Sequence, residues 1–141
     1  MPTPPIRFSP WVPWTERAFI PGSSDHGVYL LAHFGRRTVP KGPASPLDKH
    51  IVYIGETHKQ ALLKRWRNFA TSAKRGAKGH AGGRTYYRRY EKLRGDLFVA
   101  AYVPPHVYTP RQRTFLILLV EAKLVWEFSH AHRRDSLCNK H

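Results

Sequence analysis

The placement of proline divides this chain more strongly than any other feature. All twelve prolines lie within residues 2–21, 40–46 and 104–110. Because proline fixes φ and lacks a backbone donor, helix interiors and central strands are excluded from most of these segments. Residues 1–26 therefore predict an irregular N-terminal arm, whose Phe8, Trp11 and Trp14 are suited to docking on a core. Residues 27–141 are expected to form the folded domain.

Strand and helix signals alternate in the remaining segments. Strand-forming residues at 28–34, 51–55 and 97–103 predict three strands. Helical spacing runs from about 58 to 74, a weaker pattern covers 84–94, and Thr109, Pro110 and Gln112 begin a helix that continues to about 128. This order predicts an α/β (α+β) domain with a small three-stranded, mainly antiparallel sheet flanked by helices. Residues 35–48 form a long basic loop, a kind that often carries function.

The charge of the chain points to a polyanionic partner. Its 24 lysines and arginines against 9 acidic residues give a formal charge of +15. Nucleic acid is the leading partner for such a charge, and a membrane surface would also attract it. The longest aliphatic run, residues 115–120, falls far short of the ~20 residues that span a bilayer. The N-terminus lacks the pattern of a secretory signal, and Cys138, the single cysteine, permits a reducing compartment, so we expect a cytoplasmic protein.

Half of the basic charge lies between Lys59 and Arg94. Twelve lysines and arginines there accompany one acidic residue, Glu91, and tyrosines are interleaved with the arginines. Such a mixture can hold phosphates by charge and pack rings on sugars or bases. The alternative is a solvated basic face over core tyrosines. The residues expected to contact nucleic acid are Arg67, Lys78, Arg84, Tyr86, Tyr87, Arg88 and Arg89.

Glu121 is a carboxylate within the most apolar part of the chain. Burial there is costly, so Glu121 is expected to be either a buried ion-pair partner or a ligand of a hard cation such as Mg²⁺. No second carboxylate follows at helical spacing, which favours one metal over two. A zinc site can also be drawn, but its spacing matches no common closed site. Its members would be His130, His132, Cys138 and His141.

Two tyrosine tripeptides are the most specific pattern in the chain. Gly27-Val28-Tyr29 and Tyr53-Ile54-Gly55 lie on neighbouring predicted strands and precede Arg65, Glu121 and Asn139. This order resembles the GIY-YIG nuclease family over about residues 27 to 139. Valine replaces isoleucine in the first tripeptide, and Arg65 lies two residues later than in the commonest pattern. Arg67 is thus the competing assignment, although Lys64-Arg65-Trp66 favours Arg65.

The resemblance implies roles for these residues. Glu121 would anchor one Mg²⁺ or Mn²⁺, Arg65 would neutralise the scissile phosphate, and Tyr29 would orient or deprotonate water. A tyrosine pKa near ~10 requires nearby cations, or proton transfer through His80, for Tyr29 to act as a base. Residues 79–83 and the long interval between the tyrosines resemble the restriction-enzyme branch, which has a histidine near the active site. Tyr53 would position water and phosphate, and Asn139 would fix the phosphate or the glutamate.

These residues together predict a divalent-metal-dependent DNA endonuclease, restriction-like and acting on duplex DNA. Its products would carry 5′-phosphate and 3′-hydroxyl ends, and a palindromic target would imply a homodimer. Specificity would come from the arm, the loop 35–48 and the arginine-tyrosine segment. The alternatives are a structure-specific repair or recombination nuclease, and a noncatalytic basic nucleic-acid-binding protein.

Overall fold

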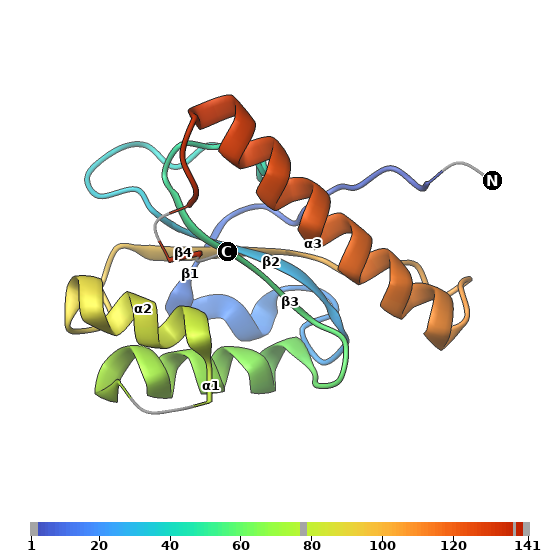
Figure 1. The fold of residues 1–141 in the computed structure, drawn as a ribbon, viewed down its shortest axis with the longest axis horizontal. Coiled ribbons are helices and arrows are strands. Elements are labelled where there is room, and N and C mark those ends of the chain that lie inside the picture. The colour runs from blue at the N-terminus through green and yellow to red at the C-terminus, as the bar shows by residue number, and fades with distance from the viewer. Residues whose placement is uncertain (1–2, 77–78, 137, 140–141) are drawn as a thin grey trace.

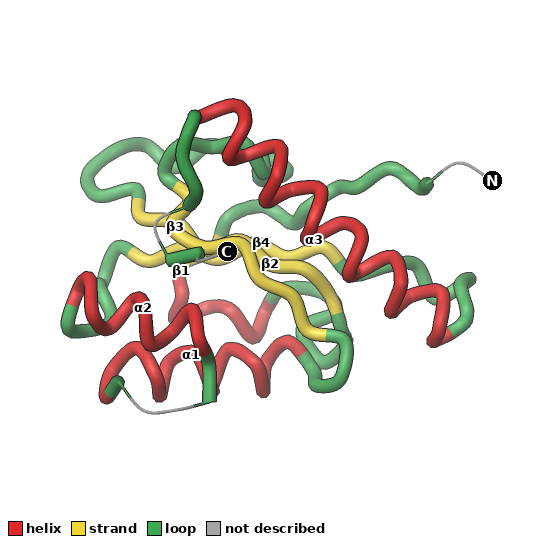
Figure 2. Tube along the Cα trace, viewed as in Figure 1, coloured by secondary structure: helices red, strands yellow, loops and turns green. Residues whose placement is uncertain are grey.

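The computed structural model describes residues 3–76, 79–136 and 138–139. Its sheet has four antiparallel strands in the order β1-β4-β2-β3, which are β1 (Val12–Pro13), β2 (Gly27–His33), β3 (Ile51–Thr57) and β4 (Leu97–Tyr102). The 3-10 helix η1 (Trp14–Phe19), α1 (Leu62–Arg75) and α2 (Ala81–Tyr90) cover one face, and α3 (Pro110–His132) covers the other (Figures 1 and 2). The predicted α+β class with an antiparallel sheet is confirmed.

The prediction of three strands is wrong, because the N-terminal arm adds a fourth. Val12 of β1 lies opposite Val99 of β4. Pro13 is tolerated there because β1 is an edge strand and needs no donor on its outer side. The aromatic residues of the arm, Phe8, Trp11 and Trp14, are buried as expected. The arm is therefore part of the sheet and of the core.

Alternation along β2 sends its side chains to the two faces of the sheet. Val28 and Leu30 belong to the core cluster that includes α3, whereas Tyr29 and Leu31 belong to the cluster that includes α1 and α2. Tyr29 lies opposite Gly55 of β3. Because residues paired across two strands share a face, the two tyrosine tripeptides meet on the side of α1 and α2.

The first two helices differ from their predicted bounds for local reasons. β3 continues to Thr57, whose hydroxyl accepts the Gln60 amide at 3.3 Å in a turn, so α1 begins at Leu62 and not near 58. α2 covers 81–90 and not 84–94. Its N-terminus is capped by the side chain of His80, and Glu91, at φ 65°, ends it.

The third helix begins as predicted. The Thr109 side chain accepts the Gln112 amide at 3.1 Å, and the Gln112 side chain accepts the Thr109 amide at 2.9 Å, which completes the capping box. α3 then continues to His132, four residues beyond its expected end. None of the described helices is long and apolar enough to cross a membrane.

Candidate functional site

The candidate site lies along β3, the edge strand of the sheet, between α2 on one face and α3 on the other (Figure 1). The segment after α3 returns to this edge, where the Cys138 amide donates to the Val52 carbonyl at 2.7 Å. Segments distant in sequence thus surround a cavity of about 250 Å³. It is lined by Tyr53, Ala81, Gly82, Arg84, Thr85, Arg88, Glu121, Cys138 and Asn139.

A hydrogen bond between Tyr29 and His80 lies beside Tyr53, whose ring centroid is 5.9 Å from that of Tyr29 and 5.5 Å from that of His80. Both residues are buried, and the Tyr29 hydroxyl lies 2.7 Å from Nε2 of His80. Nδ1 of His80 accepts the Gly83 amide at 3.1 Å, which caps α2. Burial, and then the positive charge of Arg65, lower the pKa of His80 to about 3. The ring is therefore neutral near pH 7 with its proton on Nε2, so His80 donates to the Tyr29 oxygen.

The two tyrosines are held in their protonated forms. Burial raises the pKa of Tyr29 well above its usual value, and burial raises the pKa of Tyr53 to about 12. Tyr29 has no exposed surface, and Nε2 of His80 already carries a proton. The burial of Tyr29 and the proton on His80 therefore do not favour Tyr29, acting directly or through His80, as the group that deprotonates water. They suit a positioning role for both residues.

Tyr53 connects the buried pair to the cavity. Its ring lies 5.9 Å from that of Tyr29, centroid to centroid, and the side chain of Tyr29 partly offsets the rise in the pKa of Tyr53. Tyr53 is only partly buried and lines the cavity. Because Tyr53 is held protonated, its hydroxyl can donate to an acceptor in the cavity.

Two glycines make room for the Tyr53 ring. A Cβ on Gly55 would lie 2.4 Å from Tyr53 and 2.6 Å from Tyr29, and a Cβ on Gly82 would lie 2.4 Å from another atom of the Tyr53 ring. These distances are far below van der Waals contact. The presence of glycine at position 55 of the second tripeptide is therefore explained by steric exclusion, because a Cβ would collide with both tyrosine rings. The role of Gly82 was not apparent in the sequence, because it arises from the approach of α2 to β3.

The structure brings Arg65, and not Arg67, to the tyrosines. The Arg65 guanidinium donates to the Gly79 carbonyl at 3.3 Å, and its charge lowers the pKa of both tyrosines against the effect of burial. Arg65 also lines an adjacent cavity of about 190 Å³. Arg67 is exposed on α1, and in the described part of the chain no hydrogen bond or ion pair joins it to this cluster. The geometry favours Arg65.

Glu121 lies at the cavity and not in the centre of the core. It is partly exposed, and its negative charge contributes to the raised pKa of Tyr53. A second carboxylate, which sequence reasoning missed, acts on both tyrosines. It is Glu56, 2.9 Å from Nδ1 of His58. Glu56 directly follows the second tripeptide, and this position in the sequence could have identified it as a candidate.

The donor set at Glu121 fits Mg²⁺ better than zinc. Among residues 3–76, 79–136 and 138–139, no three His, Cys, Asp or Glu side chains form a group that could hold a metal. The zinc site that can be drawn in the sequence, but that its spacing disfavours, includes His141, which lies outside the described residues. Mg²⁺ keeps several waters and uses one or two carboxylates with substrate phosphates, so a single glutamate beside an open cavity suits it.

The side chain of Asn139 forms hydrogen bonds with the backbone of β3. Its side chain accepts the Ile54 amide and donates to the Ile54 carbonyl, each at 2.9 Å, and the Ser136 hydroxyl also bonds to its Oδ1. Asn139 is buried and lines the cavity next to Tyr53. These bonds favour a role of Asn139 in holding the edge strand that carries Tyr53 over the predicted contact with a phosphate or the glutamate.

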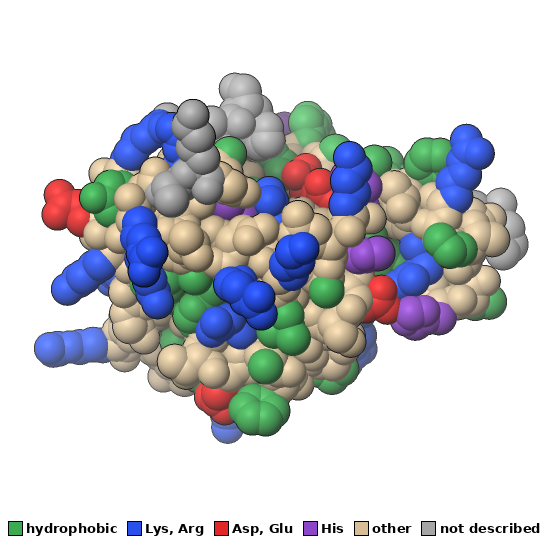
Figure 3. Space-filling view, turned by 90° about the horizontal axis from the view of Figure 1, so that it is seen from below, with side chains coloured by type: hydrophobic (Ala, Val, Ile, Leu, Met, Phe, Trp, Pro, Cys, Tyr) green, Lys and Arg blue, Asp and Glu red, His purple; other side chains and the backbone are tan. Residues whose placement is uncertain are grey.

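The predicted nucleic-acid contacts divide into exposed and buried side chains. Arg67, Arg88 and Arg89 are exposed, and Arg84 and Tyr87 are partly exposed. Lysine and arginine side chains are spread over the side of the molecule that carries α1 and α2, with few acidic side chains among them (Figure 3). Lys78 lies outside the described residues.

Tyr86 cannot contact nucleic acid in this structure, which corrects its assignment. It has no exposed surface, its hydroxyl accepts the Arg94 amide at 3.1 Å, and the same hydroxyl lies 2.7 Å from Nε2 of His33. For this tyrosine the alternative of a core residue under a basic face was right.

No family model, curated protein or solved structure matches the chain. Its function is therefore inferred from the geometry of the site.

Proposed function

We propose that this chain is a divalent-metal-dependent endonuclease of the GIY-YIG type that hydrolyses phosphodiester bonds in duplex DNA. One observation carries the proposal: Tyr53 on β3 lines a cavity with Glu121 of α3, and the charges of Glu121 and of Arg65 on α1 both act on its hydroxyl. Phosphodiester hydrolysis requires positive charge and hydrogen-bond donors at the phosphate, and a positioned water. Tyr53, Arg65 and Glu121 supply groups of these kinds.

Each of these residues has a separate role in the proposal. Arg65 would bind the scissile phosphate through its guanidinium, which suits two phosphate oxygens at once. Tyr53 would donate a hydrogen bond to the phosphate or to the attacking water. Glu121 would hold Mg²⁺ or Mn²⁺. When bound, such a cation supplies positive charge to the phosphate and lowers the pKa of water.

The remaining residues would position this group. His80 orients Tyr29 and caps α2, the ring of Tyr29 packs against that of Tyr53, and Asn139 holds the strand on which Tyr53 lies. None of them is required to change its protonation state. The water would attack in line with the 3′ oxygen, and the products would carry 5′-phosphate and 3′-hydroxyl ends.

Duplex DNA is the proposed substrate because of the charge around the site. Arg84 and Arg88 line the cavity from α2, and the chain carries a formal charge of +15. Basic side chains of this kind contact phosphates and fix the register of a protein on a duplex. We further propose a restriction-like activity, in which the loop 35–48 and α2 contact the bases beside the cleaved bond.

Conversion of supercoiled plasmid tests the proposal. Wild-type protein is incubated with Mg²⁺, Mn²⁺ or EDTA beside Glu121→Gln and the matched control Glu127→Gln, which removes the same charge from the same helix. We expect cleavage by the wild type and by the control, and none by Glu121→Gln or in EDTA. Discrete fragments support a restriction-like enzyme, and nicking without discrete fragments supports a structure-specific nuclease.

A noncatalytic nucleic-acid-binding protein is the second candidate. The observation that favours it is the burial of Tyr29 and the raised pKa of both tyrosines, which also suit a purely structural hydrogen-bond network. Intact plasmid under all metal conditions, together with a retarded and salt-sensitive complex, would select this candidate over the nuclease.

A further inference from the structure

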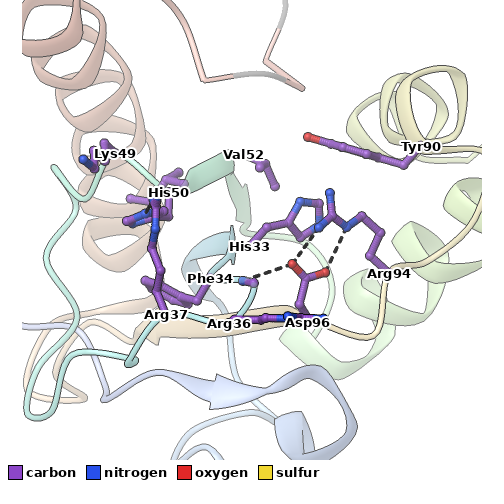
Figure 4. A pocket seen from close by; sticks show the side chains of 12 residues that line it. His33, Phe34, Arg36, Arg37, Lys49, His50, Val52, Tyr90, Arg94 and Asp96 are labelled. Carbon is purple, nitrogen blue, oxygen red and sulfur yellow. Dashed lines mark hydrogen bonds and ion pairs between the residues drawn. The ribbon is translucent and has the colours of Figure 1, made fainter.

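A second cavity lies where β2 ends and β3 begins (Figure 4). Its volume is about 480 Å³, which lies within the range of ligand sites. Its lining residues are separate from those of the candidate nuclease cavity. They are His33, Phe34, Gly35, Arg36, Arg37, Lys49, His50, Ile51, Val52, Tyr90, Arg94 and Asp96.

The charge of this cavity is strongly positive. Its one carboxylate, Asp96, is engaged by Arg94 at 2.8 and 2.9 Å and by the Gly35 amide at 3.1 Å (Figure 4). The other three basic side chains are Arg36, Arg37 and Lys49. Within the described residues, no ion pair joins them to an acidic group. Their charge is available to an anionic ligand.

Arg37 is held in place without losing its charge. Nδ1 of His50 lies 2.8 Å from the Asp48 carboxylate and donates to it, which leaves Nε2 as an acceptor for the Arg37 guanidinium. The histidine thus orients the arginine through a neutral nitrogen. A donor that is already ordered loses less conformational entropy when a ligand binds.

Aromatic side chains form the opposite wall of the cavity. The rings of His33 and Tyr90 lie edge to face with centroids 4.8 Å apart. Burial lowers the pKa of His33 to about 4, so its ring adds no charge near neutral pH. A positive side and an aromatic side together suit a sugar-phosphate unit better than a bare anion.

α2 connects this cavity to the candidate nuclease cavity. Residues of α2 from Ala81 to Arg88 line the nuclease cavity, and Tyr90, its last residue, lines the second one. On β3, Val52 lines the second cavity and the next residue, Tyr53, lines the nuclease cavity. The two cavities therefore lie beside each other along α2 and β3, where one duplex can reach both.

We infer that the second cavity binds a backbone phosphate of duplex DNA, beside the position cleaved at β3. Arg36, Arg37 and Lys49 would bind the phosphate, and Tyr90 would pack on the adjoining sugar. The cleaved position named in this inference rests on the proposed function. The binding of a phosphate in the second cavity does not depend on it. Its test therefore measures binding in EDTA, where no cleavage is required.

The test compares two double variants that remove the same charge. Arg36→Gln with Arg37→Gln alters the cavity, and Arg7→Gln with Arg111→Gln removes two exposed arginines that do not line it. Duplex affinity is measured over a range of salt concentrations. We expect the cavity variant to bind about tenfold more weakly and to lose about one unit from the slope of log K on log salt, and the control to change little. Equal losses in both variants, or a wild type that binds no duplex, would overturn the inference.

Two further results distinguish duplex binding at this cavity from a small-molecule site and from the cleavage reaction at β3. Histidine NMR signals of His33 and His50 are followed as duplex, inorganic phosphate or a mononucleotide is added. We expect them to shift with duplex at much lower concentrations than with the other two, and tight saturation by the mononucleotide would instead indicate a small-molecule site. A wild type that binds duplex through this cavity but never cleaves it would contradict the proposed nuclease and leave the inference standing.

Discussion

The Tyr29 hydroxyl on β2 lies 2.7 Å from Nε2 of His80, the residue that caps α2, although 51 positions separate them in the chain. The pair ties the sheet to α2 at the point where Tyr53 meets the cavity. Because the cap fixes Nδ1 of His80 as an acceptor, it also fixes His80 as the donor to Tyr29. The cap that orders α2 thus also sets the direction of the hydrogen bond between His80 and Tyr29.

A methyl group at Gly55 or Gly82 is expected to displace the Tyr53 ring. Either Cβ would lie 2.4 Å from that ring, whereas a Cβ on Gly95 would have no atom within 4 Å. We expect Gly55→Ala and Gly82→Ala to lower the free energy of unfolding by about 1–3 kcal/mol, and Gly95→Ala to change it little. Urea denaturation measures the difference. Equal stability of the three variants would show that the ring is not confined as described.

Asn139 is expected to control access to Cys138. The thiol is buried, burial raises its pKa to about 12, and the backbone beside it is held to β3 by the Cys138 and Asn139 hydrogen bonds. Loss of the Asn139 side chain leaves the Ile54 groups unpaired at a cost of about 1–3 kcal/mol. We therefore expect Asn139→Ala to react with a thiol reagent about tenfold faster than wild type. In the control variant Asn68→Ala, on α1, Cys138 should react with the reagent at the wild-type rate. A wild-type rate in Asn139→Ala as well would show that other contacts hold the segment after α3.

Stability is expected to fall as the pH decreases below about 6.5. His80 has a pKa of about 3 in the folded protein against an ordinary 6.5, so between these values the unfolded chain binds a proton that the folded chain does not. The free energy of unfolding therefore decreases by about 1.4 kcal/mol per pH unit from this residue. His33, with a pKa of about 4, acts in the same direction.

His80→Asn isolates the contribution of His80 to this pH dependence. Asparagine keeps an acceptor at the cap position of α2 but does not titrate in this range. Urea denaturation at several pH values should give a shallower pH dependence for the variant than for the wild type. Parallel curves would contradict a neutral, buried His80.

The class of the fold and the pairing of the strands that carry the two tyrosine tripeptides were predictable from local pattern. The tyrosine tripeptides lie on paired strands because alternation and turn residues specify β2 and β3, and the Thr109–Gln112 capping box fixes the start of α3. β1 was missed because a two-residue strand with a proline has no strand pattern of its own and forms only by pairing with β4.

The features that sequence could not supply depend on tertiary approach. Tyr86 and Tyr87 are adjacent and lie between the same arginines in the sequence. Tyr86 is buried because of how α2 packs on the sheet, which the sequence pattern does not reveal. The two hydrogen bonds between Asn139 and Ile54 likewise depend on the return of the chain to the edge of β3. The second basic cavity joins the loop after β2 to the end of α2, a proximity that no spacing in the sequence reveals.

Cleavage of a labelled duplex by Arg65→Gln and Arg67→Gln tests most directly whether the cluster at β3 is an active site. Both variants remove one arginine from α1, but only Arg65 acts on the tyrosines. In Mg²⁺ we expect Arg65→Gln to lower kcat by about 10²–10³, the usual loss when one donor to the reacting group is removed, with Arg67→Gln close to wild type. Equal activity of the two variants, or no cleavage by the wild type, would contradict this assignment.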